Sequence, residues 1–316
     1  MKKCVILCMC CNNVYYQREY EELKNTWAKP IIENKYPNIE IWSYTASPNT
    51  KYVVDYNKHM IYVPCLSDAL DGTFEKTYKA IQFLNFMGIE YDWLLRTNCS
   101  TIVNVGLLSK MLNDDVLDGN KIYTAQLFLN SITSSPFNNS LFCRGNFMLM
   151  SRKFSNLISD VGFNVAKQFD VYTRTRHVDL WMVDDAVINA IINTYCVMHE
   201  ISPTKIWQVL PFQYMDDVNE EEESVNRDSI VIFMKKMADS APLDERFDDE
   251  MKKLHMFMDK HYDSLSHDYT NITNNLKEYN VFYSYARDEK NNNIQIILPF
   301  EEIEGFWRME KTYVVD

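Results

Sequence analysis

Two adjacent carboxylates stand out among the residues that could do chemistry. Asp184 and Asp185 open a segment, residues 184–194, whose apolar spacing predicts a helix. Carboxylates are favoured at a helix start, because they accept hydrogen bonds from free backbone N–H groups and interact well with the helix dipole. A positioned carboxylate can also take a proton from a hydroxyl group as a general base. The pair therefore indicates a helix cap, a general base, or one of each.

A second polar group follows an apolar run that predicts a strand over residues 91–96. The run ends at Arg96, and Thr97, Asn98 and Ser100 come directly after it. Ligands of open α/β sheets bind beyond the carboxyl ends of the strands. The residues after Arg96 are therefore the first candidates for a binding site.

Strand and helix patterns must position these residues, and they alternate along the first part of the chain. Apolar runs and period-two alternation predict strands over residues 5–9, 39–44, 60–63, 91–96, 121–127 and 142–150. Helical spacing predicts helices over residues 18–32, 73–87, 105–112 and 184–194, with Asn104 as the cap of the third. The alternation favours an α/β domain with a mostly parallel sheet flanked by helices.

The pattern changes after Pro211, which divides the chain into three regions. Residues 1–211 form the α/β domain. Residues 212–265 hold an acidic loop, a strand over 229–233 and an amphipathic helix over 243–262, which we expect to complete that domain. Residues 266–316 form an Asn-rich accessory segment at the C-terminus, with short strand-like runs at 294–298 and 313–315.

The composition excludes several classes of protein. Hydrophobic residues make up 47% of the chain and charged residues 24%, which is enough for a core and excludes wholesale disorder. A Walker loop, GxGxxG, HExxH and GxSxG are all missing, and only seven glycines are present to cradle a phosphate. Four of the eight cysteines lie within residues 4–11, too close for a disulfide framework, so we expect free thiols. No apolar run is long enough to span a bilayer, and we expect a cytoplasmic protein.

Five segments, in order, resemble motifs of the Fringe and β-1,3-galactosyltransferase type of glycosyltransferase. They are residues 18–27 ending in Thr26-Trp27, Asp68 followed by Lys76-Thr77, residues 93–105, residues 143–151 and residues 183–186. In turn they resemble the family's Arg-rich helix ending in Thr-Trp, its Asp and Lys-Thr element, its Asp-Asp-Asp-Thr-Phe-Val-Asn strand, its glycine-bearing strand and its Glu-Asp-Val element. The resemblance ends near Pro211. It implies a Rossmann-like GT-A fold for residues 1–211.

The resemblance also implies a reaction and the residues that perform it. Such an enzyme moves a sugar from a nucleotide diphosphate carrier, here expected to be UDP-linked, onto an acceptor hydroxyl with inversion. The general base falls on Asp185, which leaves Asp184 mainly to capping. The donor-binding candidates are Arg18, Asp68, Lys76, Arg96, Thr97, Asn98 and Ser100. Tyr44 and Thr45 lie at the end of the strand over 39–44, and we expect them to contact the nucleotide base.

One departure from the family concerns the metal. The family's metal-binding aspartates fall on Asn98 and Ser100, and neutral side chains bind Mn²⁺ or Mg²⁺ far less well than carboxylates do. We therefore expect no metal cofactor, unless a carboxylate elsewhere supplies the charge. The charge on the leaving diphosphate would then need a cationic side chain, with Arg96 first among the candidates. A structural ion pair is the alternative for Arg96, and a solvated helix face is the alternative for Lys76.

Charge and composition bear on the partner. The formal net charge of −12 disfavours nucleic acid as a main partner. The scarcity of Gly, with many Asn, Tyr, Lys and Met residues, indicates an AT-rich genome of viral or phage type, and hence a host cytoplasm. Three interpretations stay open: sugar transfer to a glycan, sugar transfer to a hydroxymethylated DNA base, and a catalytically silent module that binds a nucleotide-sugar or glycan.

Overall fold

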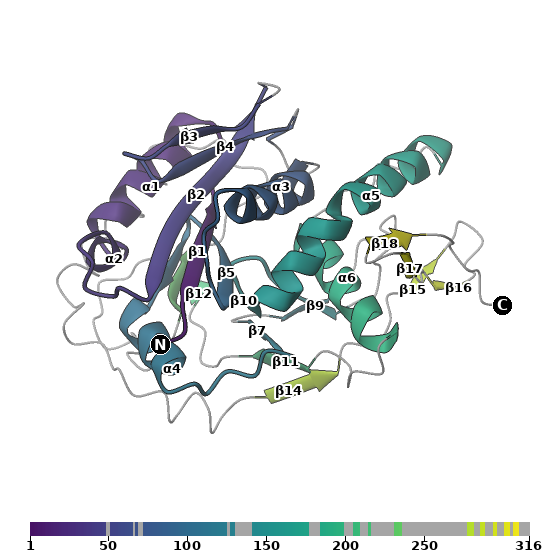
Figure 1. Ribbon diagram of the computed structural model, residues 1–316. Helices are drawn as coiled ribbons and strands as arrows, with labels where there is room; N and C mark the ends of the chain where they lie inside the picture. The colour runs from purple at the N-terminus through teal and green to yellow at the C-terminus, as the bar shows by residue number, and fades with distance from the viewer. Residues whose placement is uncertain are drawn as a thin grey trace.

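The computed structural model describes most of the first 198 residues and eight short strands beyond them. The described ranges are 1–48, 51–65, 67–68, 72–124, 127–129, 141–176 and 184–198, then 205–208, 214–215, 231–235, 277–280, 285–287, 293–295, 300–303 and 306–309. Within these residues the protein has an α/β architecture, as the sequence predicts (Figure 1).

A nine-stranded sheet lies at the centre of the described chain, in the order β14-β11-β7-β10-β5-β1-β2-β4-β3. Its strands are β1 (Cys4–Met9), β2 (Ile39–Ser47), β3 (Val53–Asp55), β4 (Met60–Pro64), β5 (Trp93–Asn98), β7 (Ile122–Thr124), β10 (Phe147–Ser151), β11 (Lys205–Gln208) and β14 (Lys277–Asn280). The predicted strands over residues 5–9, 39–44, 60–63 and 91–96 are confirmed as β1, β2, β4 and β5.

Helices cover both faces of this sheet. On one face lie α1 (Val14–Asn25), α2 (Lys29–Ile32) and α4 (Val105–Asn113), and on the other α3 (Thr73–Phe86), α5 (Arg152–Arg176) and α6 (Asp184–Met198) (Figure 1). Successive side chains of β1 point to opposite faces of the sheet. Ile6 and Cys8 therefore pack toward α1, α2 and α4, and Val5 and Leu7 toward α3, α5 and α6. A strand buried on both faces is apolar throughout, as β1 is.

The strand directions correct the expectation of a mostly parallel sheet. The pairs β1–β2, β1–β5, β2–β4 and β7–β11 are parallel, whereas β3–β4, β5–β10, β7–β10 and β11–β14 are antiparallel. The sheet is therefore mixed. Antiparallel neighbours can be joined without a crossover helix, and the chain passes from β7 to β10 by way of β8 (Leu127–Leu129) and β9 (Leu141–Cys143), which pair with each other.

One expectation about helices was wrong, and one helix was missed. The helix expected over residues 18–32 is two helices, because α1 ends at Asn25 and α2 places Pro30 in its first turn. A continuous helix would set the Pro30 ring against the carbonyl group four residues earlier, whereas a first turn needs no N–H donor at that position. The long helix α5 was not predicted. Asn104 does cap α4, since its side chain accepts a hydrogen bond from Leu107 N at 3.1 Å.

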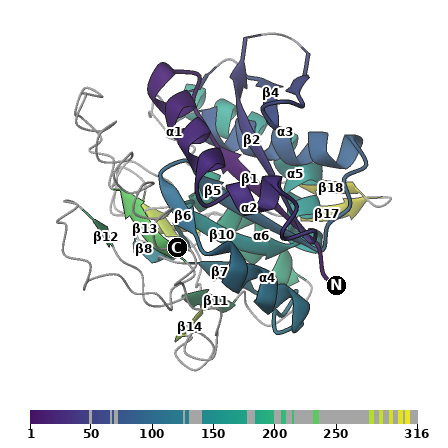
Figure 2. The same ribbon diagram turned by 90° about the vertical axis from the view of Figure 1, so that its left-hand side faces the viewer.

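Part of the chain beyond residue 211 joins the first domain. Strand β13 (Val231–Lys235) pairs with β6 (Thr101–Val103) and β12 (Tyr214–Met215), as Figure 2 shows, and β14 from the expected accessory segment joins the main sheet. The remaining described strands are β15 (Tyr285–Arg287), β16 (Asn293–Gln295), β17 (Phe300–Ile303) and β18 (Phe306–Met309). The helix expected over 243–262 and the run at 313–315 lie outside the described residues. In the described part of the chain, no helix combines the length and the hydrophobicity that a membrane crossing requires.

Candidate functional site

The candidate site lies at the edge of the sheet where the parallel strands end. Strands β4, β2, β1 and β5 run in the same direction, so their carboxyl ends meet at one edge. The chain leaves β1 for β2 on one side and returns later to β5 on the other, which makes β1 and β5 a topological switch point. The start of β10 lies at the same edge, because β10 is antiparallel to β5 and Phe147 pairs with Thr97.

A buried ion pair connects β5 with the start of α6. Arg96 donates from Nε to Asp184 Oδ2 at 2.7 Å and from Nη2 to Asp184 Oδ1 at 2.9 Å. Arg96 is 1% exposed and Asp184 is 2% exposed. A bidentate, charge-assisted pair of this kind fixes the orientation of both side chains. Asp184 was expected mainly to cap the helix, and its side chain instead forms the partner of Arg96.

The remaining donors of Arg96 are also engaged. Its Nη1 donates to Asn98 Oδ1 at 2.5 Å and to the Gly145 carbonyl oxygen, and its Nη2 also contacts the sulfur of Met9 at 3.3 Å. A guanidinium group has five N–H donors, and each has a protein acceptor here. Burial lowers the pKa of Arg96, but Asp184 and other nearby groups raise it above the ordinary value, so the side chain stays charged.

Gly145 connects Arg96 with Asp185. Its N–H donates to Asp185 Oδ2 at 3.1 Å, while Ala186 N donates to Asp185 Oδ1 at 2.8 Å. A Cβ atom at Gly145 would lie 2.5 Å from Arg96 Nη1 and 2.7 Å from Arg96 Cζ. Only glycine therefore lets the guanidinium group pack directly against this backbone.

The environment of Asp185 makes its carboxyl group unusually basic. Burial, and then the negative charge of Asp184, raise the pKa of Asp185 to about 7, although Arg96 and two backbone hydrogen bonds act in the opposite direction. A carboxylate with a pKa near neutrality can both exist in its ionised form and accept a proton with useful driving force. These are the properties of a general base, and Asp185 is the residue for which the sequence predicts that role.

Three hydroxyl groups extend this group of side chains to α3 and β2. Thr77 Oγ1 lies 3.0 Å from Asp184 Oδ2 and 2.8 Å from the hydroxyl group of Tyr44, and Thr73 Oγ1 accepts from Asp184 N at 3.2 Å. We refer to the residues joined in this way as the Arg96 cluster; its members are Arg96, Asn98, Gly145, Asp184, Asp185, Thr73, Thr77 and Tyr44. Tyr44 was expected beside a nucleotide base, and it is fully buried.

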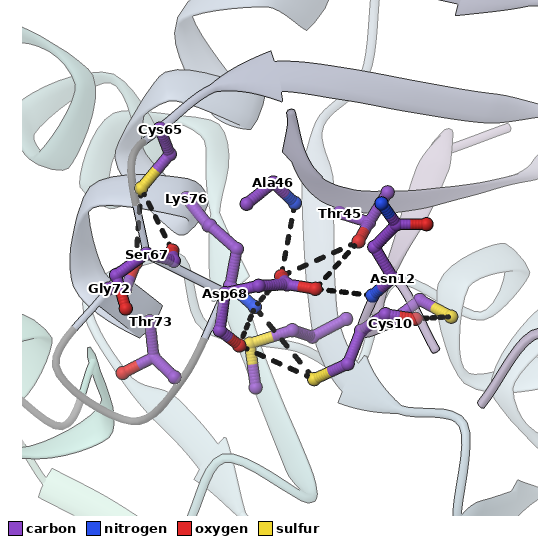
Figure 3. Close-up of polar contacts among 12 residues, drawn as sticks. Cys10, Asn12, Thr45, Ala46, Cys65, Ser67, Asp68, Gly72, Thr73 and Lys76 are labelled. Carbon is purple, nitrogen blue, oxygen red and sulfur yellow. Dashed lines mark hydrogen bonds and ion pairs between the residues drawn. The ribbon is translucent and has the colours of Figure 1, made fainter. Parts of the chain in front are cut away.

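A second group of polar side chains surrounds Asp68, in the segment between β4 and α3 (Figure 3). Lys76 Nζ lies 2.7 Å from Asp68 Oδ1 and 3.1 Å from the Asp68 carbonyl oxygen. The carboxylate also accepts from Ala46 N at 3.1 Å, from the backbone N–H of Asn12 and from Thr45 Oγ1 at 3.4 Å. The Asp68 cluster, made of these five residues and Cys11, therefore joins the ends of β1 and β2 to α3.

Lys76 is fully buried, which corrects the alternative of a solvated helix face. Its ammonium group contacts two oxygen atoms of Asp68 and, at 4.0 Å, the sulfur of Cys11. Asp68 keeps 26% of its side chain exposed. The cation of this pair is therefore enclosed by protein, while the carboxylate faces the edge of the sheet.

The other predicted residues lie in different surroundings. Thr97 is buried and donates to the Asn146 carbonyl oxygen at 2.6 Å, and Ser100 is buried in the turn between β5 and β6. Arg18 is exposed on α1, whereas Arg96 and Lys76, the cations of the two clusters, are buried. The described residues contain no group of three or more His, Cys, Asp or Glu side chains that is arranged to hold a metal ion. All eight cysteines are free thiols, as predicted.

The role of Asp184 as the partner of Arg96 was not predicted, although the sequence contains one signal for it. A charged side chain in a strand that is buried on both faces needs an opposite charge nearby. Arg96 in the apolar β5 therefore required a carboxylate, and Asp184 was the neighbour of the proposed base. Comparison with models of known protein families finds no match, and neither does comparison with curated proteins.

Proposed function

We propose that the chain is a glycosyltransferase that moves a sugar from a UDP-linked donor onto an acceptor hydroxyl with inversion. One observation carries the proposal. Segments chosen from the sequence for their resemblance to such enzymes, around Asp68, Lys76, Arg96, Gly145 and Asp185, meet at the carboxyl edge of β1, β2 and β5. Ligands of α/β sheets bind at this edge.

In the proposed reaction Asp185 acts as the general base. The acceptor oxygen attacks the anomeric carbon, the bond from that carbon to the diphosphate oxygen breaks, and the hydroxyl proton passes to the Asp185 carboxylate. Two backbone N–H groups, those of Gly145 and Ala186, hold the carboxylate in place. A base held in this way needs little reorientation when the substrate arrives.

Transfer by the purified protein tests the proposal. Wild type and Asp185→Asn are incubated with UDP-linked sugars, and release of UDP with and without an acceptor is measured. Loss of a general base costs about a hundredfold to ten-thousandfold in rate, and we expect UDP affinity to be nearly unchanged. Turnover by Asp185→Asn at the wild-type rate would show that Asp185 is only a residue at the start of α6.

A module that binds a nucleotide-sugar or glycan without turnover is the second candidate. It is favoured because all five N–H donors of Arg96 have protein acceptors, which leaves none for the charge that develops on a leaving diphosphate. It predicts that a UDP-sugar raises the melting temperature, because a ligand at about 100 times its Kd stabilises the folded state by about 2.7 kcal/mol. The same UDP-sugar would stay intact after prolonged incubation, which separates this candidate from a transferase.

A further inference from the structure

Arg96 lies in the candidate site, but its contacts differ from those of a phosphate ligand. The guanidinium group is 1% exposed and is surrounded by Asp184, Asn98, the Gly145 carbonyl group and Met9. A diphosphate would have to displace one of these acceptors before it could bind. The two strongest contacts, at 2.7 and 2.9 Å to Asp184, are charge-assisted and are the most costly to break.

We propose that Arg96 is a positioning residue that holds Asp184 and Asp185 in place, and that it does not bind the donor diphosphate. That this role of Arg96 serves catalysis rests on the proposed function. That Arg96 holds the two carboxylates in position rests on its contacts alone.

Arg96 reaches Asp185 by two routes. The first is the bidentate pair with Asp184, which fixes the residue next to Asp185 at the start of α6. The second passes through Gly145, whose carbonyl group accepts from Arg96 and whose N–H donates to Asp185. The guanidinium group also packs closely on this backbone, because a Cβ atom at Gly145 would lie 2.5 Å from Arg96 Nη1.

The effect of Arg96 on Asp185 can be measured through the pKa of the Asp185 carboxyl group. Asp184 on the same helix raises the pKa of Asp185, and Arg96 from β5 lowers it. The Cys143 thiol of β9 faces the same carboxylate, and Tyr44 of β2 lies within the field of Arg96 and Asp184. Cys143 and Tyr44 are both buried, and the pKa of each is raised, so both stay neutral near neutral pH.

Four variants test the inference. Arg96→Met removes the cation, and Arg96→Met with Asp184→Asn removes both charges of the pair, which keeps a buried carboxylate from being left without its partner. Arg96→Lys keeps the charge but loses the planar fork. Arg152→Met is the control, because it removes the same charge from an exposed site at the opposite end of β5, where Arg152 N bonds to Asp92 O.

Two kinds of measurement, one of protonation and one of binding and turnover, are made on each variant. The first is the pKa of the Asp185 carboxyl group from ¹³C NMR, assigned by comparison with Asp185→Asn. The second is the calorimetric Kd for UDP, together with kcat for transfer. We expect Arg96→Met to raise the pKa of Asp185, the double variant to lower it again, and Arg152→Met to leave it unchanged. We expect Arg96→Lys to retain the wild-type Kd for UDP. We expect its kcat to fall about a hundredfold, because a small displacement of a catalytic group can slow a reaction by that factor.

The results that would overturn the inference are distinct. A pKa of Asp185 that is the same in Arg96→Met as in wild type shows that Arg96 does not govern this carboxylate. A Kd for UDP that is weakened about tenfold or more in Arg96→Lys, the loss expected for one broken phosphate contact, shows that Arg96 is a diphosphate ligand. If wild type neither binds UDP nor transfers a sugar, the proposed function fails, and the NMR measurement alone decides whether Arg96 positions Asp185.

Discussion

Burial sets how much each ionisable residue at the sheet edge tolerates the loss of its partner. Arg96 and Asp184 are both buried, and Lys76 is fully buried, whereas Asp68 keeps about a quarter of its side chain exposed. Removing one member of a buried ion pair leaves a charge that water cannot reach, at a cost of about 3–5 kcal/mol. A partly exposed charge can be hydrated instead. The two members of the Asp68–Lys76 pair should therefore respond differently to substitution.

We expect Asp68→Asn to be more destabilising than Lys76→Met. The first change leaves the Lys76 ammonium group buried without a carboxylate, and should lower the free energy of unfolding by about 3 kcal/mol. The second leaves Asp68 with water and with its backbone donors Asn12 and Ala46, and should cost about 1–2 kcal/mol. Urea unfolding of both variants measures the difference. The reverse order would mean that the buried stem of Lys76 matters more than its charge.

The pKa of Asp185 predicts how stability depends on pH. The pKa is about 7 in the folded protein against 3.8 for an unperturbed group, so the folded state holds the proton more tightly. Stability from this group is then fully present below about pH 4 and is lost as pH rises toward 7, by on the order of 4 kcal/mol. Asp185→Asn removes this dependence. We expect the variant to gain stability relative to wild type between pH 4 and pH 8.

Urea unfolding of wild type and Asp185→Asn at both pH values gives the comparison. Only the change in the difference between the two proteins is used, because carboxylates far from Asp185 contribute equally to both. The substitution also costs one backbone hydrogen bond, since the amide oxygen can replace only one of the carboxylate oxygens that Gly145 N and Ala186 N contact. That cost is the same at both pH values. A difference that stays constant with pH would contradict the raised pKa.

At the scale of elements, the local sequence pattern predicted individual strands and helices, but not the direction of β10 or the pairing of distant residues. The strands β1, β2, β4 and β5 and the helices α3 and α4 follow from apolar spacing and, for α4, from the Asn104 cap. The direction of β10 depends on the route of the chain between elements, which spacing does not contain. The Arg96–Asp184 pair joins residues 88 positions apart, and only the need of a buried charge for a partner points to it.

The missed helix α5 is a different case, because its signal is present in the sequence. Phe154, Leu157, Ile158, Val161 and Val165 are buried and follow the spacing of one helix face. Gly162 stands in the middle of this pattern, where glycine costs about 1 kcal/mol relative to alanine. The structure explains it, because a Cβ atom at Gly162 would overlap the Tyr78 side chain of α3.

We expect Gly162→Ala to destabilise the protein by about 1–3 kcal/mol, since overpacking at the contact between α3 and α5 outweighs the gain in helix propensity. Asn164→Ala is the matched control, because Asn164 is exposed on the same helix. Its replacement should raise the free energy of unfolding by less than about 0.5 kcal/mol, since alanine has the higher helix propensity. Thermal unfolding of both variants makes the comparison. A stabilised Gly162→Ala protein would show that α3 and α5 are not held at this close approach.

At the scale of the whole molecule, the two clusters share their supports. Tyr44 and Thr45 are consecutive on β2, and Lys76 and Thr77 are consecutive on α3, with one of each pair in either cluster. The end of β2 and the start of α3 therefore belong to both. A displacement of α3 would move Asp68 and Asp184 together, so substitutions in one cluster should not be treated as independent of the other.

The metal dependence of the proposed sugar transfer is predicted by the residues at and after the end of β5. Asn98 offers a neutral amide oxygen that already accepts from Arg96 at 2.5 Å, and Ser100 is a buried hydroxyl, so neither supplies the anionic oxygen that Mn²⁺ and Mg²⁺ prefer. We expect sugar transfer to persist in excess EDTA, with the charge of the leaving diphosphate met by a cationic side chain other than Arg96. Turnover of metal-stripped protein is compared with and without Mn²⁺, and an unchanged melting temperature in EDTA serves as the control for folding. Complete loss of turnover on chelation, restored by Mn²⁺, would show that carboxylates outside Asn98 and Ser100 bind a metal that the reaction requires.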